Sequence, residues 1–163
     1  MTPPELLGLL EEFYRDKARL LQRHEAVARV VAQYEINNTY QYVIQREEQH
    51  QSWLRDAILA SGGREQSVPP PEPVQAATGA DGQRALAGQD ADALDAFVAG
   101  WRGRLDAVKH ARHRLMLDLV LGETLEQARF FGQAAGGRVD MLGRRTGGEQ
   151  RTPGGVLPSR WVE

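Results

Sequence analysis

Apolar residues recur at alternating steps of three and four along the first part of the chain, the spacing of a helix that buries one face against other helices. The residues that share this spacing are Leu6, Leu10, Phe13, Leu20, Val27, Val31 and Tyr34. Two polar residues, Lys17 and His24, interrupt the row. Thr2 and Glu5 have the spacing of a capping box. The pattern predicts a first helix over residues 3–34.

A second helix is predicted over residues 38–61. Asn and Thr residues around position 37 favour a turn before it, and Gly62 with the following glycine ends it. Without that turn the helix would run for about sixty residues, far beyond the usual length. The apolar residues of its inward face are Tyr40, Val43, Leu54 and Ala57. Glu47 and His50 fall on the same face, and because an unpaired buried carboxylate is costly, Glu47 needs a partner, a proton or a metal.

The second half of the chain predicts two more helices after a long crossover. Residues 64–89 contain a proline-rich stretch that cannot be helical inside, so they are expected to form the crossover. Helices follow over residues 90–112 and 115–135. One inward row for the last helix is Met116, Leu119, Glu123, Glu126 and Phe130. A rotation of ~100° about the helix axis would instead bury Leu117, Val120 and Leu121, and both registers stay open.

Composition narrows the functional classes. The 163 residues carry a net charge of −2 and no cysteine, which argues against a general nucleic-acid surface and excludes thiolate metal sites. The N-terminus has neither the basic nor the apolar region of a signal peptide, and no apolar run approaches the ~20 residues of a membrane span. The expected location is therefore the cytoplasm, without membrane or nucleic-acid partners. The expected organisation is one domain over residues 1–137 and a Gly/Arg-rich tail over 138–163.

The end of the tail is apolar again after a glycine-rich spacer. Leu157 and Trp161 could anchor a short segment on a protein surface, because an aromatic anchor on a flexible spacer has the layout of a docking peptide. We therefore expect the tail to bind a protein partner or a second copy of the chain. The alternative is an end that makes no contact.

The two halves are alike, since each ends a helix at Gly-Gly and carries acidic residues at equivalent places, in Arg46–Gln51 and Gly122–Gln127. Two helical hairpins joined by a long crossover make an antiparallel four-helix bundle. Over roughly residues 5–135 the chain resembles the ferritin-like superfamily, including the rubrerythrin- and bacterioferritin-type di-iron carboxylate proteins. In that family each half supplies a Glu from its first helix and a Glu-x-x-His from its second. Glu47-x-x-His50 matches this motif.

The second half departs from the family pattern. Glu123-x-x-Glu126 has a glutamate where the family has histidine, and His24 lies where the first-helix glutamate is expected. The resemblance implies a site for iron or manganese formed by Glu47, His50, Glu123, Glu126 and His24, with iron or redox handling as its function. Whether the chain is an enzyme is left open.

Two readings of these residues remain at this point. In one, the polar residues are metal ligands. In the other, Glu47 and His50 are a satisfied buried pair with Lys17 or Arg129, the metal site has decayed, and the bundle works through protein association.

Overall fold

The computed structural model describes residues 1–77 and 79–139, which form helices and no strand. The helices are α1 (Pro3–Ala28), α2 (Tyr34–Ala60), α3 (Gly79–Leu105) and α4 (Ala111–Ala135). The all-α prediction is confirmed for this part of the chain. None of the described helices is both long enough and apolar enough to cross a membrane.

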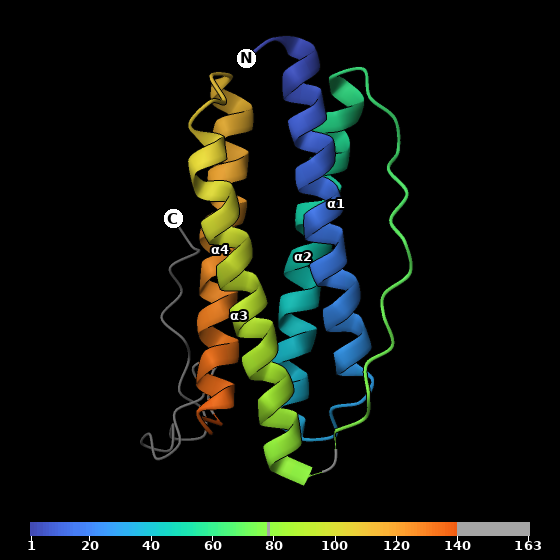
Figure 1. Ribbon diagram of the computed structural model, residues 1–163, viewed down its shortest axis with the longest axis vertical. Coiled ribbons are helices and arrows are strands. Elements are labelled where there is room, and N and C mark those ends of the chain that lie inside the picture. The colour runs from blue at the N-terminus through green and yellow to red at the C-terminus, as the bar shows by residue number, and fades with distance from the viewer. Residues whose placement is uncertain (78, 140–163) are drawn as a thin grey trace, which may run out of the picture.

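The four helices lie side by side with their axes roughly parallel to the long axis of the molecule (Figure 1). Helix α1 contacts α2 and α3, and α4 contacts α3 and α2. Following the chain in Figure 1, each of these pairs runs antiparallel. The segment after α2 returns along the length of the bundle before α3 begins. Gln66 fixes this segment to α1, because its side chain bonds Arg15 at 2.8 Å and Glu11 at 3.1 Å.

The first turn is earlier in the chain than the sequence predicts. The capping box of Thr2 and Glu5 is present, but α1 ends at Ala28 and α2 already begins at Tyr34. The predicted turn near residue 37 is wrong because Asn37 acts from inside α2. Its side-chain amide donates to the carbonyl of Ala28 at 2.7 Å and so caps the end of α1.

The third helix is longer at its start than predicted. It begins at Gly79 rather than at residue 90, so residues 79–89 belong to the helix and not to the crossover. This stretch contains as many glycines as alanines, so its helix depends on packing, and Leu86 and Ala87 are buried within the bundle. Its contacts also explain the position of the first turn, because Gln83 accepts a hydrogen bond from the backbone N–H of Gln33 at 2.8 Å.

The last turn also comes early, because α3 ends at Leu105 rather than near residue 112. Arg114 donates from Nη1 to the Leu105 carbonyl at 2.5 Å, which satisfies a free acceptor at the helix end. His110 then caps α4, with its ring accepting a hydrogen bond from the backbone N–H of His113 at 3.4 Å.

Helix α4 adopts the rotated register. Leu117 and Val120 are fully buried, whereas Leu119 is 49% exposed, so the row through Glu123 and Glu126 does not face the core.

The core itself divides into two apolar clusters, one toward each end of the bundle. The cluster near the start of α1 comprises Leu9, Leu10, Phe13, Leu54, Ala57, Ile58, Val98, Trp101, Leu105, Val108, Leu117, Val120 and Leu121. The cluster near the end of α1 comprises Val27, Ala28, Val31, Ile36, Tyr40, Val43, Ile44, Leu86, Ala87, Ala91, Leu94, Ala128, Phe131 and Ala134.

Candidate functional site

A buried polar layer lies between the two apolar clusters, and its centre is the ion pair of Lys17 and Glu47. Lys17 Nζ lies 2.7 Å from Glu47 Oε1, and both side chains are completely buried. Lys17 also donates to Gln127 Oε1 on α4 at 3.4 Å. Of the two partners that the sequence suggests for Glu47, Lys17 is therefore correct and Arg129 is wrong, because Arg129 pairs with Glu126.

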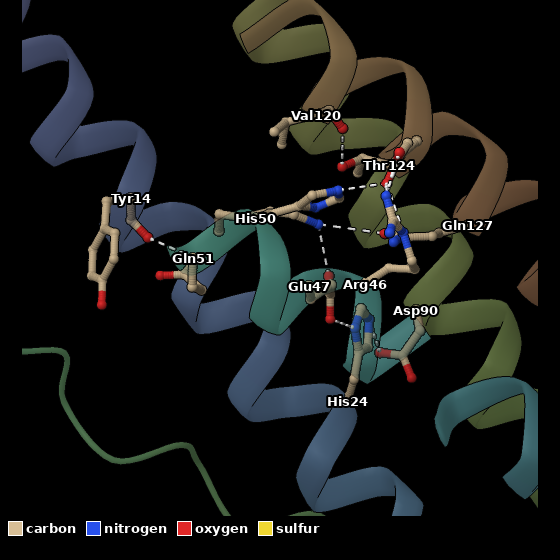
Figure 2. A network of polar contacts seen from close by, with 12 residues as sticks. Tyr14, His24, Arg46, Glu47, His50, Gln51, Asp90, Val120, Thr124 and Gln127 are labelled. Carbon is tan, nitrogen blue, oxygen red and sulfur yellow. Dashed lines mark hydrogen bonds and ion pairs between the residues drawn. The ribbon is translucent and has the colours of Figure 1, made fainter. Parts of the chain in front are cut away.

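His24 forms a hydrogen bond with the other oxygen of the Glu47 carboxylate. Its Nδ1 lies 2.6 Å from Glu47 Oε2, and its Nε2 points toward Asp90 Oδ1 at 4.0 Å, too far for a hydrogen bond (Figure 2). Asp90 is fully buried on α3 and has two partners of its own. Arg23 donates from Nε to Asp90 Oδ1 at 2.5 Å, and the Tyr40 hydroxyl donates to Oδ2. Burial and the Asp90 carboxylate raise the pKa of Tyr40, so the hydroxyl keeps the proton that it donates.

His50 faces α4 rather than Glu47. Its Nε2 lies 2.7 Å from Glu123 Oε2. Arg46, one turn earlier on α2, holds the same carboxylate with two nitrogens, Nη2 at 2.6 Å and Nε at 3.1 Å (Figure 2). Burial by itself raises the pKa of Glu123, but these hydrogen bonds outweigh it and the pKa is lowered. Glu123 is thus an ionised acceptor at the edge of the polar layer.

The inward pair on α4 is Thr124 and Gln127, in place of the predicted Glu123 and Glu126. Both are buried and spaced i, i+3, as Glu47 and His50 are on α2. Thr124 donates to the Val120 carbonyl of its own helix at 2.7 Å. The Glu126 side chain is about half exposed and pairs with Arg129 outside the bundle. The predicted residues Glu47, His50, His24 and Glu123 are therefore brought together, and Glu126 is not.

The pKa values of Glu47 and His50 are both lowered, but for different reasons. Burial alone raises the pKa of Glu47, but the charges and hydrogen bonds of His24 and Lys17 outweigh burial and lower that pKa from 4.5 to about 2. At His50, burial and the Lys17 charge lower the pKa of the ring from 6.5 to about 4, although Glu123 opposes them. His50 is consequently neutral near neutral pH. It donates from Nε2 to Glu123, and its Nδ1 lone pair has no hydrogen-bond partner among the described residues.

The arrangement does not fit the metal site that the resemblance implies. Both oxygens of Glu47 are already used, one by an ammonium and one by an imidazole. A lysine ammonium is a cation that cannot act as a ligand while it is protonated, and here it lies where a metal would have to meet Glu47. Within residues 1–77 and 79–139, no group of three or more His, Asp or Glu side chains is placed to hold a metal ion.

Three further residues of the layer, Asp90, Thr124 and Gln127, are not among the predicted site residues. The predicted start of the third helix at residue 90 placed Asp90 outside the core. A signal was available, because extending the apolar row of that helix back through Leu94 and Ala87 places Asp90 on the buried side, as Lys17 is placed in the first helix. The predicted docking residues of the tail, Leu157 and Trp161, lie outside the described residues.

Comparisons with other proteins give no match among family models, curated proteins or solved structures.

Proposed function

We propose that this chain is a ferritin-like helical module in which a network of lysine, carboxylate and histidine takes the place of a metal centre, and that it works by association with protein rather than by metal chemistry. The observation that carries the proposal is the buried ion pair, in which Lys17 Nζ lies 2.7 Å from Glu47 Oε1. An ammonium at this distance supplies the positive charge that a metal ion would otherwise supply to the carboxylate.

The course of the chain supports the ferritin-like part of the proposal. Two antiparallel hairpins, α1–α2 and α3–α4, are joined by a connection that runs back along the bundle, as in bundles with one long crossover (Figure 1). Glu47 and His50 keep the Glu-x-x-His spacing on α2. On α4 the equivalent inward pair is Thr124 and Gln127, which supplies neither a carboxylate nor an imidazole.

Exposed apolar side chains support the association part. Leu115 and Leu119 lie one turn apart on α4 and are 73% and 49% exposed. Neighbouring exposed leucines on one helix face are an unfavourable use of a solvated surface and a favourable use of an interface. The apolar end of the tail, with Leu157 and Trp161, offers a second association element in the same proposal.

Elemental analysis of the purified protein, together with thermal unfolding in the presence of Fe(II), Mn(II) or Zn(II), tests the absence of metal chemistry. The expected result is no stoichiometric metal and no increase in Tm, because a metal that binds only the folded state would raise it. One or two ions per chain, with a metal-dependent Tm that is lost in Glu47→Gln, would contradict the proposal.

Light scattering tests association. The chain is expected to form an oligomer or to bind a protein partner. The double variant Leu115→Gln/Leu119→Gln should weaken this association. Deletion of residues 156–163 tests in the same way whether the tail contributes to association. The association part is rejected if the full chain is monomeric and binds no partner, as the variants are then expected to be.

A metal-binding ferritin-like protein, with iron or manganese handling as its function, is the second candidate. One observation favours it. His24 Nε2 and His50 Nδ1 are buried ring nitrogens that have no hydrogen-bond partner among the described residues, and imidazole nitrogen is a common metal ligand. The metal analysis above separates this candidate from the first.

A further inference from the structure

The outward face of α4 carries three exposed leucines around a glycine. Leu125 is 43% exposed and joins Leu115 and Leu119 on this face. At ~100° per residue, the three leucines and Gly122 lie within an arc of about 120° around the helix. Gly122 is in the middle of the arc, and a Cβ added there would have no atom within 4 Å. The face therefore has a shallow gap at its centre with leucines on both sides.

Two residues of opposite charge lie on the same arc. Asp118 is about one turn before Gly122, and Arg129 is about two turns after it. Asp118 accepts from Arg114 through Oδ2, and Arg129 donates to Glu126 from Nη2. Both side chains are about half exposed. Because each side chain has further hydrogen-bonding atoms, each can accept one more partner of opposite charge.

This face is complementary to itself when two copies of α4 meet antiparallel and cross at Gly122. A twofold axis at that point preserves the edge of the arc on which a residue lies, and Asp118 and Arg129 share the edge away from α2. At ~1.5 Å per residue, Asp118 lies ~6 Å along the helix from the crossing point, and Arg129 of the second copy lies ~10 Å along it in the same direction. The difference is about one helical turn, which an arginine side chain spans. Symmetry forms this ion pair twice.

The edge of the arc toward α2 is apolar in the same arrangement. Leu115 of the second copy comes level with Phe130, which is partly buried and whose ring meets Tyr42 of α2 at a centroid distance of 5.9 Å. Glu126 lies between the leucines of the second copy, and its carboxylate keeps its pair with Arg129. Leucine on one copy therefore meets an aromatic pair on the other.

The glycine at the crossing point is not explained by the isolated bundle. Glycine is unfavourable inside a helix, and the space beside Gly122 would accept a larger residue. The distance between two packed helices depends on the side chains at their contact, so a glycine there allows the backbones to come close. A second helix across this face gives Gly122 a role that the single chain does not.

We propose that the outward face of α4 binds the same face of a second copy of this chain, in an antiparallel homodimer that crosses at Gly122. The inference rests on the association part of the proposed function and names its partner. One helix from each copy makes an interface at the small end of the usual range, so the dimer is expected to dissociate at micromolar concentration.

Sedimentation velocity of the full chain from ~1 to ~500 µM tests the proposal, with monomer expected at the low end and dimer at the high end. Gly122→Gln fills the crossing point and should raise the dissociation constant at least about tenfold, while Tm stays the same or rises because glutamine favours a helix. Gly132→Gln is the matched control. Gly132 is an equally open glycine of α4 but lies outside the arc and ~15 Å from the crossing point, so the dissociation constant should not change.

A charge exchange tests the register of the two helices. Asp118→Arg and Arg129→Asp should each weaken the dimer about tenfold, because each brings like charges together across the interface. The double variant Asp118→Arg/Arg129→Asp should restore it, since the ion pair is formed again with its members exchanged. Dimerisation through the tail or through another face would not show this restoration.

The inference is overturned if the full chain stays monomeric over the whole range, if Gly122→Gln dimerises like the unchanged chain, or if the double exchange restores nothing. A dimer that survives Gly122→Gln but is lost on deletion of residues 156–163 would assign association to the tail. That result would reject this interface and leave the proposed association intact. A metal found in the core would reject the metal-free part of the proposed function and leave the dimer unaffected.

Discussion

The two hairpins contribute to the polar layer in different ways. The α1–α2 hairpin contains Lys17, His24 and Glu47, and its carboxylate is neutralised entirely by partners of the same hairpin. The acids of the α3–α4 hairpin depend on the other half, since Asp90 is held by residues of α1 and α2, and Glu123 by residues of α2. The first hairpin is thus electrostatically self-sufficient, and the second is satisfied only in the assembled bundle. A layer built this way needs no added cation.

The largest effect is expected from removing the cation of the self-sufficient half. Lys17→Met leaves Glu47 charged in a buried site, and breaking such a pair costs roughly 3–5 kcal/mol of unfolding free energy. Denaturant unfolding at neutral pH measures this loss. The double variant Lys17→Met/Glu47→Gln should recover a large part of it, because the unpaired charge is gone. A loss below about 1 kcal/mol for Lys17→Met would show that the pair contributes like an exposed one.

The next effect is a pH dependence at the junction of the two halves. The pKa of His50 is about 4 in the fold against 6.5 for an ordinary histidine. Between these values the unfolded chain binds a proton that the folded chain does not, so stability falls as the pH falls through this window. The expected loss is about 3 kcal/mol. Above the window this contribution is fully present.

His50→Gln should flatten the stability profile in that window, measured by denaturant unfolding at several pH values. His113 has a pKa lowered by burial and by the charge of His110, so it contributes with the same sign. It is less buried, and His113→Gln is therefore the matched control with the smaller change. A profile that is equally steep in His50→Gln would place the titration elsewhere. Glu47 adds a separate loss as the pH falls from 4.5 toward about 2.

A smaller loss is expected at the dependent half. Asp90→Asn removes the charge held by Arg23 but keeps an acceptor for Tyr40, and should cost roughly 1–3 kcal/mol. The control is Glu12→Gln, which breaks another ion pair between α1 and α3, with Arg104, that is about half exposed. That change should cost less than about 1 kcal/mol. Equal costs in the two variants would show that burial of Asp90 adds nothing.

The smallest effect is expected at Thr124. Its hydroxyl donates to the Val120 carbonyl of its own helix at 2.7 Å and makes no hydrogen bond to another helix among the described residues. Thr124→Val should change the unfolding free energy by less than about 1 kcal/mol, because the methyl groups fill the same space and the carbonyl keeps its helical bond. A larger loss in chemical denaturation would mean that the hydroxyl participates in the layer.

The sequence predicted the helices better than their ends. Apolar spacing is a property of the chain itself, so the four helices and the burial of Glu47, His50 and His24 could be found from it. The turn at residues 29–33 could not, because the contacts that fix it come from Asn37 and Gln83, which meet it only in the folded bundle. Tertiary contacts of this kind decide where a helix ends.

The candidate site was likewise predictable where the chain pattern alone decides burial, and not where packing decides it. Lys17 was visible as a polar interruption of an apolar row, and its partner Glu47 was visible as another. The register of α4 was not, since two faces of that helix were almost equally apolar, and only packing against α2 and α3 selects Thr124 and Gln127 as the inward pair. Asp90 was hidden by an error of about three turns in the start of α3, because the stretch after the prolines contains as many glycines as alanines.

The crossover has a consequence for protein engineering. A break in the peptide chain between Pro69 and Pro71 removes no contact between helices, since each half already contains a complete hairpin. The two pieces would associate through contacts between the two halves, such as those of Lys17 with Gln127 and of Arg23 with Asp90. The chain is thus a natural candidate for a split protein, in which reassembly of two separately produced fragments reports that whatever they are fused to has come together.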